Sequence, residues 1–133
     1  MNRFLVQSAG LLLAVILMAS NSAAQTSAAQ TKTFKGEITD DKLNCIQTPL
    51  KAPADIKDKH ICVLYWAHYV QPAGKFVLYD AATKTTYQLD DQNMAQPYVA
   101  EKVEVTGTLD AASKTIKVTA IMADESAAKA DKS

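Results

Sequence analysis

Arginine is almost missing from this chain, and its scarcity argues against one large class of function. Only Arg3 is an arginine among the 14 basic residues; the others are lysines, and 14 acidic residues balance them. A guanidinium group recognises phosphate and carboxylate through a rigid pair of hydrogen bonds that the lysine ammonium does not provide. No stretch of the sequence gathers lysines into the positive stripe that phosphate binding requires. The composition therefore predicts no nucleic-acid partner.

Long apolar stretches are also scarce, and the one that is present lies near the N-terminus. Residues 9–19 (AGLLLAVILMA) are apolar or small, but a membrane-spanning helix needs about 20 such residues. Arg3 before this run and the small residues 22–24 (SAA) after it match a secretory signal peptide. We expect residues 1–24 to be cleaved, with no integral membrane segment afterwards and no lipid anchor, since the first cysteine is Cys45. The protein is then exported, to the periplasm or outside the cell.

Cysteine occurs only twice, at Cys45 and Cys62. Exported proteins meet oxidants, and an even number of cysteines in such a chain indicates pairing. A Cys45–Cys62 disulfide would close a loop of about 18 residues and stabilise the domain by about 3 kcal/mol.

Histidine is equally sparse, and both copies lie near Cys62. Imidazole and thiolate ligate zinc and copper, so His60, Cys62 and His68 form an alternative metal site. A disulfide at Cys62 would remove the thiolate, and we expect no bound cofactor. Cys62 and His68 also have the chemistry of a nucleophile and its base, but no glycine-flanked nucleophile motif accompanies them. We therefore expect a protein that is not an enzyme.

Composition divides the rest of the chain into three parts. Residues 25–32 and 124–133 are small and polar, which predicts a flexible lead-in and a disordered tail. Residues 33–123 remain as one small domain.

Alternation of apolar and polar residues predicts that this domain is mainly β. Alternation with a period of two is typical of half-buried antiparallel strands. Residues 75–80 are apolar on both faces, which favours a central strand. Two near-identical hexapeptides, 80–85 (DAATKT) and 110–115 (DAASKT), stand between strand-like runs and predict hairpin turns. The expected strands cover residues 34–39, 75–80, 85–89, 102–109 and 116–122.

Two other segments do not alternate. Residues 90–100 begin with Asp90 and Asp91, which suit the start of a short helix better than a calcium site. Residues 57–70 have apolar residues at helical spacing but are also rich in strand formers, so helix and strand both remain open, with a short helix favoured. This order of elements predicts a small five-stranded OB-like antiparallel barrel with one or two short helices. Gly36 and Gly107 would permit its sharp coiling.

Three strings in these strands resemble an uncharacterised family of small exported bacterial proteins, known mainly from acidobacteria-like genomes. They are 74–80 (GKFVLYD), 87–92 (YQLDDQ) and 103–110 (VEVTGTLD), and the likeness extends to 34–40 and to both cysteines. It covers nearly the whole folded part. The resemblance implies an OB-like fold and no established activity. Relatives often carry a further cysteine at the position of Trp66.

Tyr65, Trp66 and Tyr69 are the densest aromatic cluster, and we take them as the candidate ligand-binding residues. Exposed aromatic rings suit flat uncharged ligands, although Trp66 alternatively fills one end of the barrel. Composition and arrangement together predict an exported, non-catalytic binding or envelope-associated module. Its partner would be a small neutral ligand or an envelope component, and the protein would be a monomer. The runner-up is a small periplasmic metal-binding protein.

Overall fold

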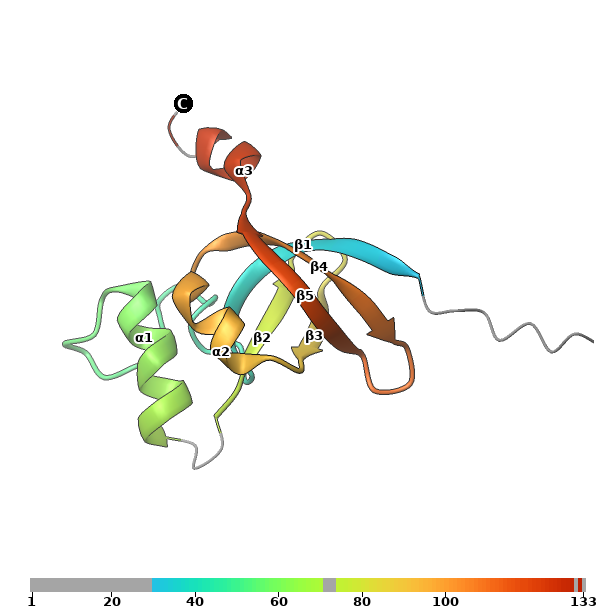
Figure 1. Ribbon diagram of the computed structural model, residues 1–133. Coiled ribbons are helices and arrows are strands. Elements are labelled where there is room, and N and C mark those ends of the chain that lie inside the picture. Colours follow the sequence, from blue (N-terminus) through green and yellow to red (C-terminus); the bar gives the residue numbers. More distant parts are fainter. Residues whose placement is uncertain (1–29, 71–73, 131, 133) are drawn as a thin grey trace, which may run out of the picture.

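Five strands form one sheet that closes on itself (Figure 1). The computed structural model describes residues 30–70, 74–130 and 132. The predicted signal peptide lies outside the described residues. In chain order the elements are β1 (Thr31–Asp40), α1 (Lys59–Tyr65), the π-helical turn η1 (Trp66–Val70), β2 (Phe76–Asp80), β3 (Thr85–Leu89), α2 (Gln92–Ala95), the 3₁₀ turn η2 (Gln96–Tyr98), β4 (Lys102–Asp110), β5 (Thr115–Ala123) and α3 (Glu125–Ala130).

The strands follow one another around the ring in the order β1-β2-β3-β5-β4, and β4 pairs back to β1. All neighbouring pairs are antiparallel except β3 and β5, which are parallel over Gln88–Leu89 and Thr115–Ile116. The mainly β fold predicted from the sequence, with mostly antiparallel strands, is therefore confirmed, and one neighbouring pair is parallel. The reason is parity: strand direction alternates around a closed ring only when the number of strands is even, so five strands leave one parallel pair.

The interior of the ring is filled by the apolar residues that the alternation pattern placed inside. Ile38, Leu78, Val105 and Ile116 are completely buried. Val77 is buried as well as Leu78, so β2 is covered on both faces, as its sequence predicted. Val63 of α1 and Ala95 of α2 are buried too and belong to the same core cluster, so both helices pack against the ring.

Both repeated hexapeptides form the predicted hairpin turns, and they adopt the same conformation. The Asp80 carboxylate accepts a hydrogen bond from the Ala82 amide at 2.9 Å, and Asp110 accepts one from Ala112 at 3.0 Å. Each turn then ends in a lysine with a left-handed backbone, at φ 53° and φ 51° respectively. Aspartate at the first turn position is the feature that the sequence shares at both places.

The two ends of the domain differ from the prediction. β1 begins at Thr31, inside the expected lead-in. The expected disordered tail contains α3, because Asp124 accepts hydrogen bonds from the amides of Ser126 and Ala127 at 3.1 and 3.3 Å. Aspartate in this position is a standard helix-starting residue. Among the described residues, no helix is long and apolar enough to cross a membrane.

Gly107 allows β4 to coil closely against β5. The register between the two strands shifts between Thr106 and Gly107, as at a β-bulge. A Cβ atom built at Gly107 would lie 2.3 Å from the Lys117 carbonyl oxygen. That separation is far inside van der Waals contact, and a backbone atom cannot move away as a flexible side chain could.

Replacing Gly107 with alanine should therefore destabilise the domain by about 1–3 kcal/mol, because the two strands must separate locally. Urea unfolding followed by circular dichroism measures this loss. Thr108→Ala, on the same strand but with no added atom, serves as the control. A Gly107→Ala protein as stable as the control would show that the close approach of β4 and β5 is not required.

Candidate functional site

A disulfide organises the long connection between β1 and β2. Cys45 and Cys62 are bonded to each other, with their Cα atoms 5.8 Å apart, and both residues are completely buried. This confirms the predicted bridge. It joins the loop after β1 to the middle of α1, so the helix is held against the ring by a covalent bond.

Asp40, the last residue of β1, positions the cysteine for this bond. Its side chain is completely buried. It accepts hydrogen bonds at 3.0 Å from the backbone amides of Asn44 and Cys45, and a third from the Asn44 side-chain amide at 3.0 Å. The carboxylate therefore satisfies donors that the tight loop buries, and it sets the direction in which the chain leaves the sheet.

The segment over residues 57–70 is helical, which confirms the favoured interpretation. Asp58 starts α1 by accepting a hydrogen bond from the Ile61 amide at 2.9 Å. The helix then widens into the π-helical turn η1. A wider turn alters which side of the helix the following side chains occupy. Tyr69 ends 83% exposed instead of packing on the core.

The predicted aromatic cluster forms, but its three members have different surroundings. The ring centroids of Tyr65 and Trp66 are 5.9 Å apart, and those of Tyr65 and Tyr69 are 6.4 Å apart. Trp66 packs against the buried core, and its indole N–H donates to the Lys51 carbonyl. Trp66 thus joins the helix to the loop that precedes it, which leaves Tyr69 as the most exposed ring.

Trp66→Ala should therefore destabilise the protein by about 2–4 kcal/mol, through lost packing and the freed carbonyl of Lys51. Thermal unfolding of the purified variant measures the effect. Tyr69→Ala is the matched control and should change stability by less than about 0.5 kcal/mol, since its ring is exposed. Equal effects of the two substitutions would contradict this division of roles.

The structure does not assemble the three residues of the alternative metal site. Cys62 is used by the disulfide, so it offers no thiolate. The His60 ring nitrogen Nδ1 lies 3.0 Å from the Val99 carbonyl, whereas the His68 ring packs edge-on against Phe76 with centroids 6.0 Å apart. Within residues 30–70, 74–130 and 132, no group of three or more histidine, cysteine or acidic side chains is placed to hold a metal ion.

Asp90 and Asp91 both accept backbone hydrogen bonds, Asp90 from a distant strand and Asp91 within its own helix. Asp90, which follows β3, accepts a hydrogen bond from the Val118 amide of β5 at 2.8 Å. This bond holds the beginning of the segment between β3 and β4 against β5. Asp91 accepts one from the Met94 amide at 2.9 Å and so begins α2, as the sequence predicted for this pair of acids.

A groove on the outer face of β1 is the feature that sequence reasoning missed. It has two adjoining halves, of about 430 and 500 Å³. Both halves are lined by Glu37, Lys59, Lys102 and Asp124. We call this the β1 groove. Its first half reaches the β2–β3 turn and is lined also by Lys35, Gly36, Ile46, Tyr79, Asp80, Ala81 and Ala82. Its second half reaches α3 and is lined also by Ala100, Glu101, Ala123, Ala127 and Ala128.

Strand register explains why charged residues meet in the β1 groove. Glu37 of β1 lies opposite Tyr79 of β2 on one side and opposite Lys102 of β4 on the other. The Glu37 side chain is only 13% exposed and forms an ion pair with Lys59 of α1. The disulfide-held helix therefore supplies one wall of the groove.

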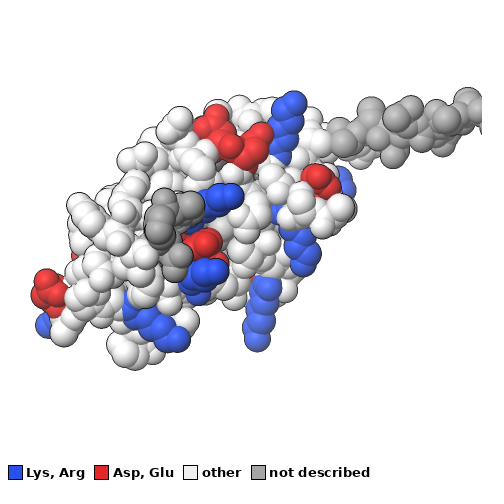
Figure 2. Space-filling view, turned by 90° about the horizontal axis from the view of Figure 1, so that it is seen from below, with Lys and Arg blue, Asp and Glu red and all other residues white. Residues whose placement is uncertain are grey.

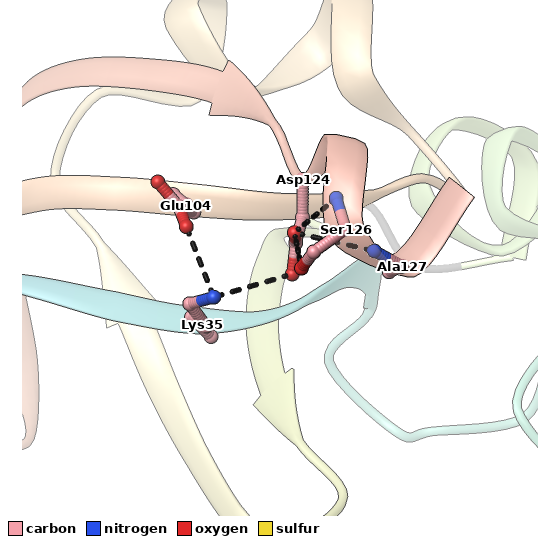
Figure 3. A network of polar contacts seen from close by, with 5 residues as sticks. All are labelled: Lys35, Glu104, Asp124, Ser126 and Ala127. Carbon is pink, nitrogen blue, oxygen red and sulfur yellow. Dashed lines mark hydrogen bonds and ion pairs between the residues drawn. The ribbon is translucent and has the colours of Figure 1, made fainter. Parts of the chain in front are cut away.

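A second polar network lies along the groove (Figure 3). The Lys35 ammonium lies 3.1 Å from a carboxylate oxygen of Glu104 and 3.8 Å from one of Asp124. The hydrogen bond to Glu104, followed by the charge of Asp124, holds the pKa of Lys35 above its ordinary value. The pKa of Asp124 lies below its ordinary value, chiefly because the Ser126 hydroxyl donates a hydrogen bond to it. Both shifts favour the charged forms of Lys35 and Asp124 at neutral pH.

The surface charges are mixed, as the composition suggested. On the face shown in Figure 2, lysine and acidic side chains are interspersed among uncharged residues. That view contains no continuous stripe of positive charge.

The sequence contained a weak signal for the β1 groove. Lys35 and Glu37 in β1, and Lys102 and Glu104 in β4, alternate opposite charges on the polar faces of two strands. The sequence does not reveal that β1 and β4 are neighbours, or that Lys59 and Asp124 reach the same place. No family model, curated protein or solved structure matches this chain.

Proposed function

We propose that this protein is an exported, non-catalytic binding module built on an OB-like barrel, and that its ligand binds in the β1 groove. The single observation that carries the proposal is the groove itself. Its volume lies in the range of small-molecule sites, and charged side chains from four separate parts of the chain converge in it.

The arrangement of strands supports the OB-like interpretation. The β1-β2-β3-β5-β4 ring has a short helix between its third and fourth strands, and that order agrees with a five-stranded OB barrel. Such barrels commonly bind ligands beside their strands and the adjoining loops. The resemblance to small exported bacterial proteins points the same way.

Export is proposed from the N-terminal pattern and from the disulfide. A buried bridge is typical of proteins that mature in an oxidising compartment, which here means the periplasm or the space outside the cell. The bridge also supports a non-catalytic role, because Cys62 cannot act as a nucleophile beside His68. We propose a monomer that binds either a small neutral ligand or an envelope component.

An NMR fragment screen tests this function without assuming the ligand. The panel contains uncharged, cationic and anionic compounds, and amide shifts are followed in the ¹⁵N-labelled protein. We expect uncharged polar compounds to shift Gly36, Glu37, Ala81 and Ala82. Shifts confined to residues 65–69 would instead support the aromatic cluster as the site, and no shifts with any compound would contradict the binding function.

A further inference from the structure

We propose that the β1 groove takes a short uncharged oligosaccharide, with one sugar ring lying against Tyr79. This inference rests on the proposed function and names the class of ligand. It is argued from the charges of the groove, from the hydrogen bonding of its floor and from the one aromatic ring in it.

The charges of the first half of the groove cancel. Three lysines line it, and so do three carboxylates; they are Lys35, Lys59, Lys102, Glu37, Asp80 and Asp124. A strongly charged ligand would be attracted by the groups of opposite charge and repelled by an equal number of groups of its own charge. A hydroxyl group both donates and accepts hydrogen bonds, so it is satisfied by ammonium and by carboxylate groups alike. A ligand rich in hydroxyl groups therefore matches a lining of this kind.

The floor of the groove argues against an extended peptide. Peptides that bind to sheets add a strand at an open edge and pair with free backbone groups. Glu37, at the centre of the groove, is paired on both sides, with Tyr79 of β2 and with Lys102 of β4. At Glu37 the sheet therefore offers side chains to a ligand and no open edge, whereas Lys35 and Gly36 are paired with β4 but not with β2. The titration of tetra-alanine below tests whether a peptide binds there.

Tyr79 supplies the apolar contact that a sugar ring needs. It is partly exposed, lines the groove beside Gly36, and lies opposite Glu37 in the strand register. In the described part of the chain, no hydrogen bond or ring contact occupies its side chain. An aromatic face covers the C–H face of a sugar, while its hydroxyl group remains free to bond. Lys102, also without an ion pair among the described residues, provides a nearby donor.

Isothermal titration with chitotetraose, an uncharged tetramer of N-acetylglucosamine, tests the proposal; cellotetraose and tetra-alanine are titrated in parallel. We expect at least one saccharide to bind and tetra-alanine not to bind. Tyr79→Ala should weaken binding at least about tenfold, whereas Tyr79→Phe, which keeps the ring, should stay within about threefold. Lys102→Met should weaken binding less, by about threefold to tenfold.

Two control variants lie outside the groove. Lys117→Met removes an exposed lysine of β5, and Tyr69→Ala removes the exposed ring of η1; both should bind the saccharide as the unchanged protein does. Circular dichroism verifies that each variant is folded. If Tyr79→Ala does not fold, the affinity of Lys102→Met for the saccharide decides whether the β1 groove is the binding site. Binding that Tyr79→Ala leaves unchanged, or binding of tetra-alanine alone, would overturn the inference. If neither saccharide binds but the fragment screen shifts the groove residues, the saccharide inference fails and the binding function stands.

Discussion

Replacing Asp40 with alanine is expected to destabilise the protein by roughly 3–5 kcal/mol, the largest effect of any single substitution considered for this chain. The carboxylate is completely buried and accepts hydrogen bonds from the backbone amides of Asn44 and Cys45. Alanine would leave both donors without an acceptor, and each unsatisfied buried donor costs about 1–3 kcal/mol. The loop that carries Cys45 would no longer be held at the end of β1.

Urea unfolding of the oxidised protein measures this loss. Asp55→Ala provides the control, because Asp55 is an exposed aspartate of the same connection; it should change the free energy of unfolding by less than about 0.5 kcal/mol. A loss below about 1 kcal/mol for Asp40→Ala would show that water or neighbouring groups replace the carboxylate, and that the loop does not depend on it.

Removing the disulfide should have an effect of similar size. The double variant Cys45→Ala/Cys62→Ala should lose about 3 kcal/mol, because the bridge restricts the unfolded chain over 17 residues of sequence separation. For a domain of this size, that corresponds to a fall in melting temperature of roughly 12–24 °C. Alanine is chosen because both positions are completely buried, where a serine hydroxyl would need a partner.

Differential scanning calorimetry follows this change, and the unchanged protein unfolded in the presence of a reductant is the control. Both should melt at nearly the same lowered temperature. A double variant that melts within a few degrees of the oxidised protein would contradict the role of the bridge. We also expect its α1 amides to exchange with solvent faster than those of β4, since α1 depends on the bridge and β4 on the sheet.

The strands of this domain were predictable because their information is local. Alternation placed residues such as Val103 and Val105 on one face, and both are completely buried. The turns were predictable for the same reason, since Asp80 and Asp110 bond within their own turns. The sequence pattern does not predict α3, although Asp124 is a recognisable helix-starting residue, because the small polar composition of residues 124–133 is typical of a disordered tail.

The site was not predictable in the same way because it is made of distant parts. Glu37, Lys59, Lys102 and Asp124 come together only when β1 pairs with β4 and the disulfide brings α1 to the ring. No spacing in the sequence encodes that meeting. The aromatic cluster, in contrast, is visible in the sequence as a local pattern. The pattern alone does not show that Trp66 packs against the core and donates a hydrogen bond to the Lys51 carbonyl.

The central claim is that the β1 groove, and no other surface, holds the ligand. The most direct test is an isotope-filtered NOE experiment on ¹³C-labelled protein with unlabelled chitotetraose, which detects only contacts between protein and sugar. We predict contacts from sugar ring protons to the Tyr79 ring, to the Ala82 methyl group and to the Lys102 side chain. Contacts to Tyr65 or Tyr69 instead would contradict the claim and would show that the ligand binds at the aromatic cluster.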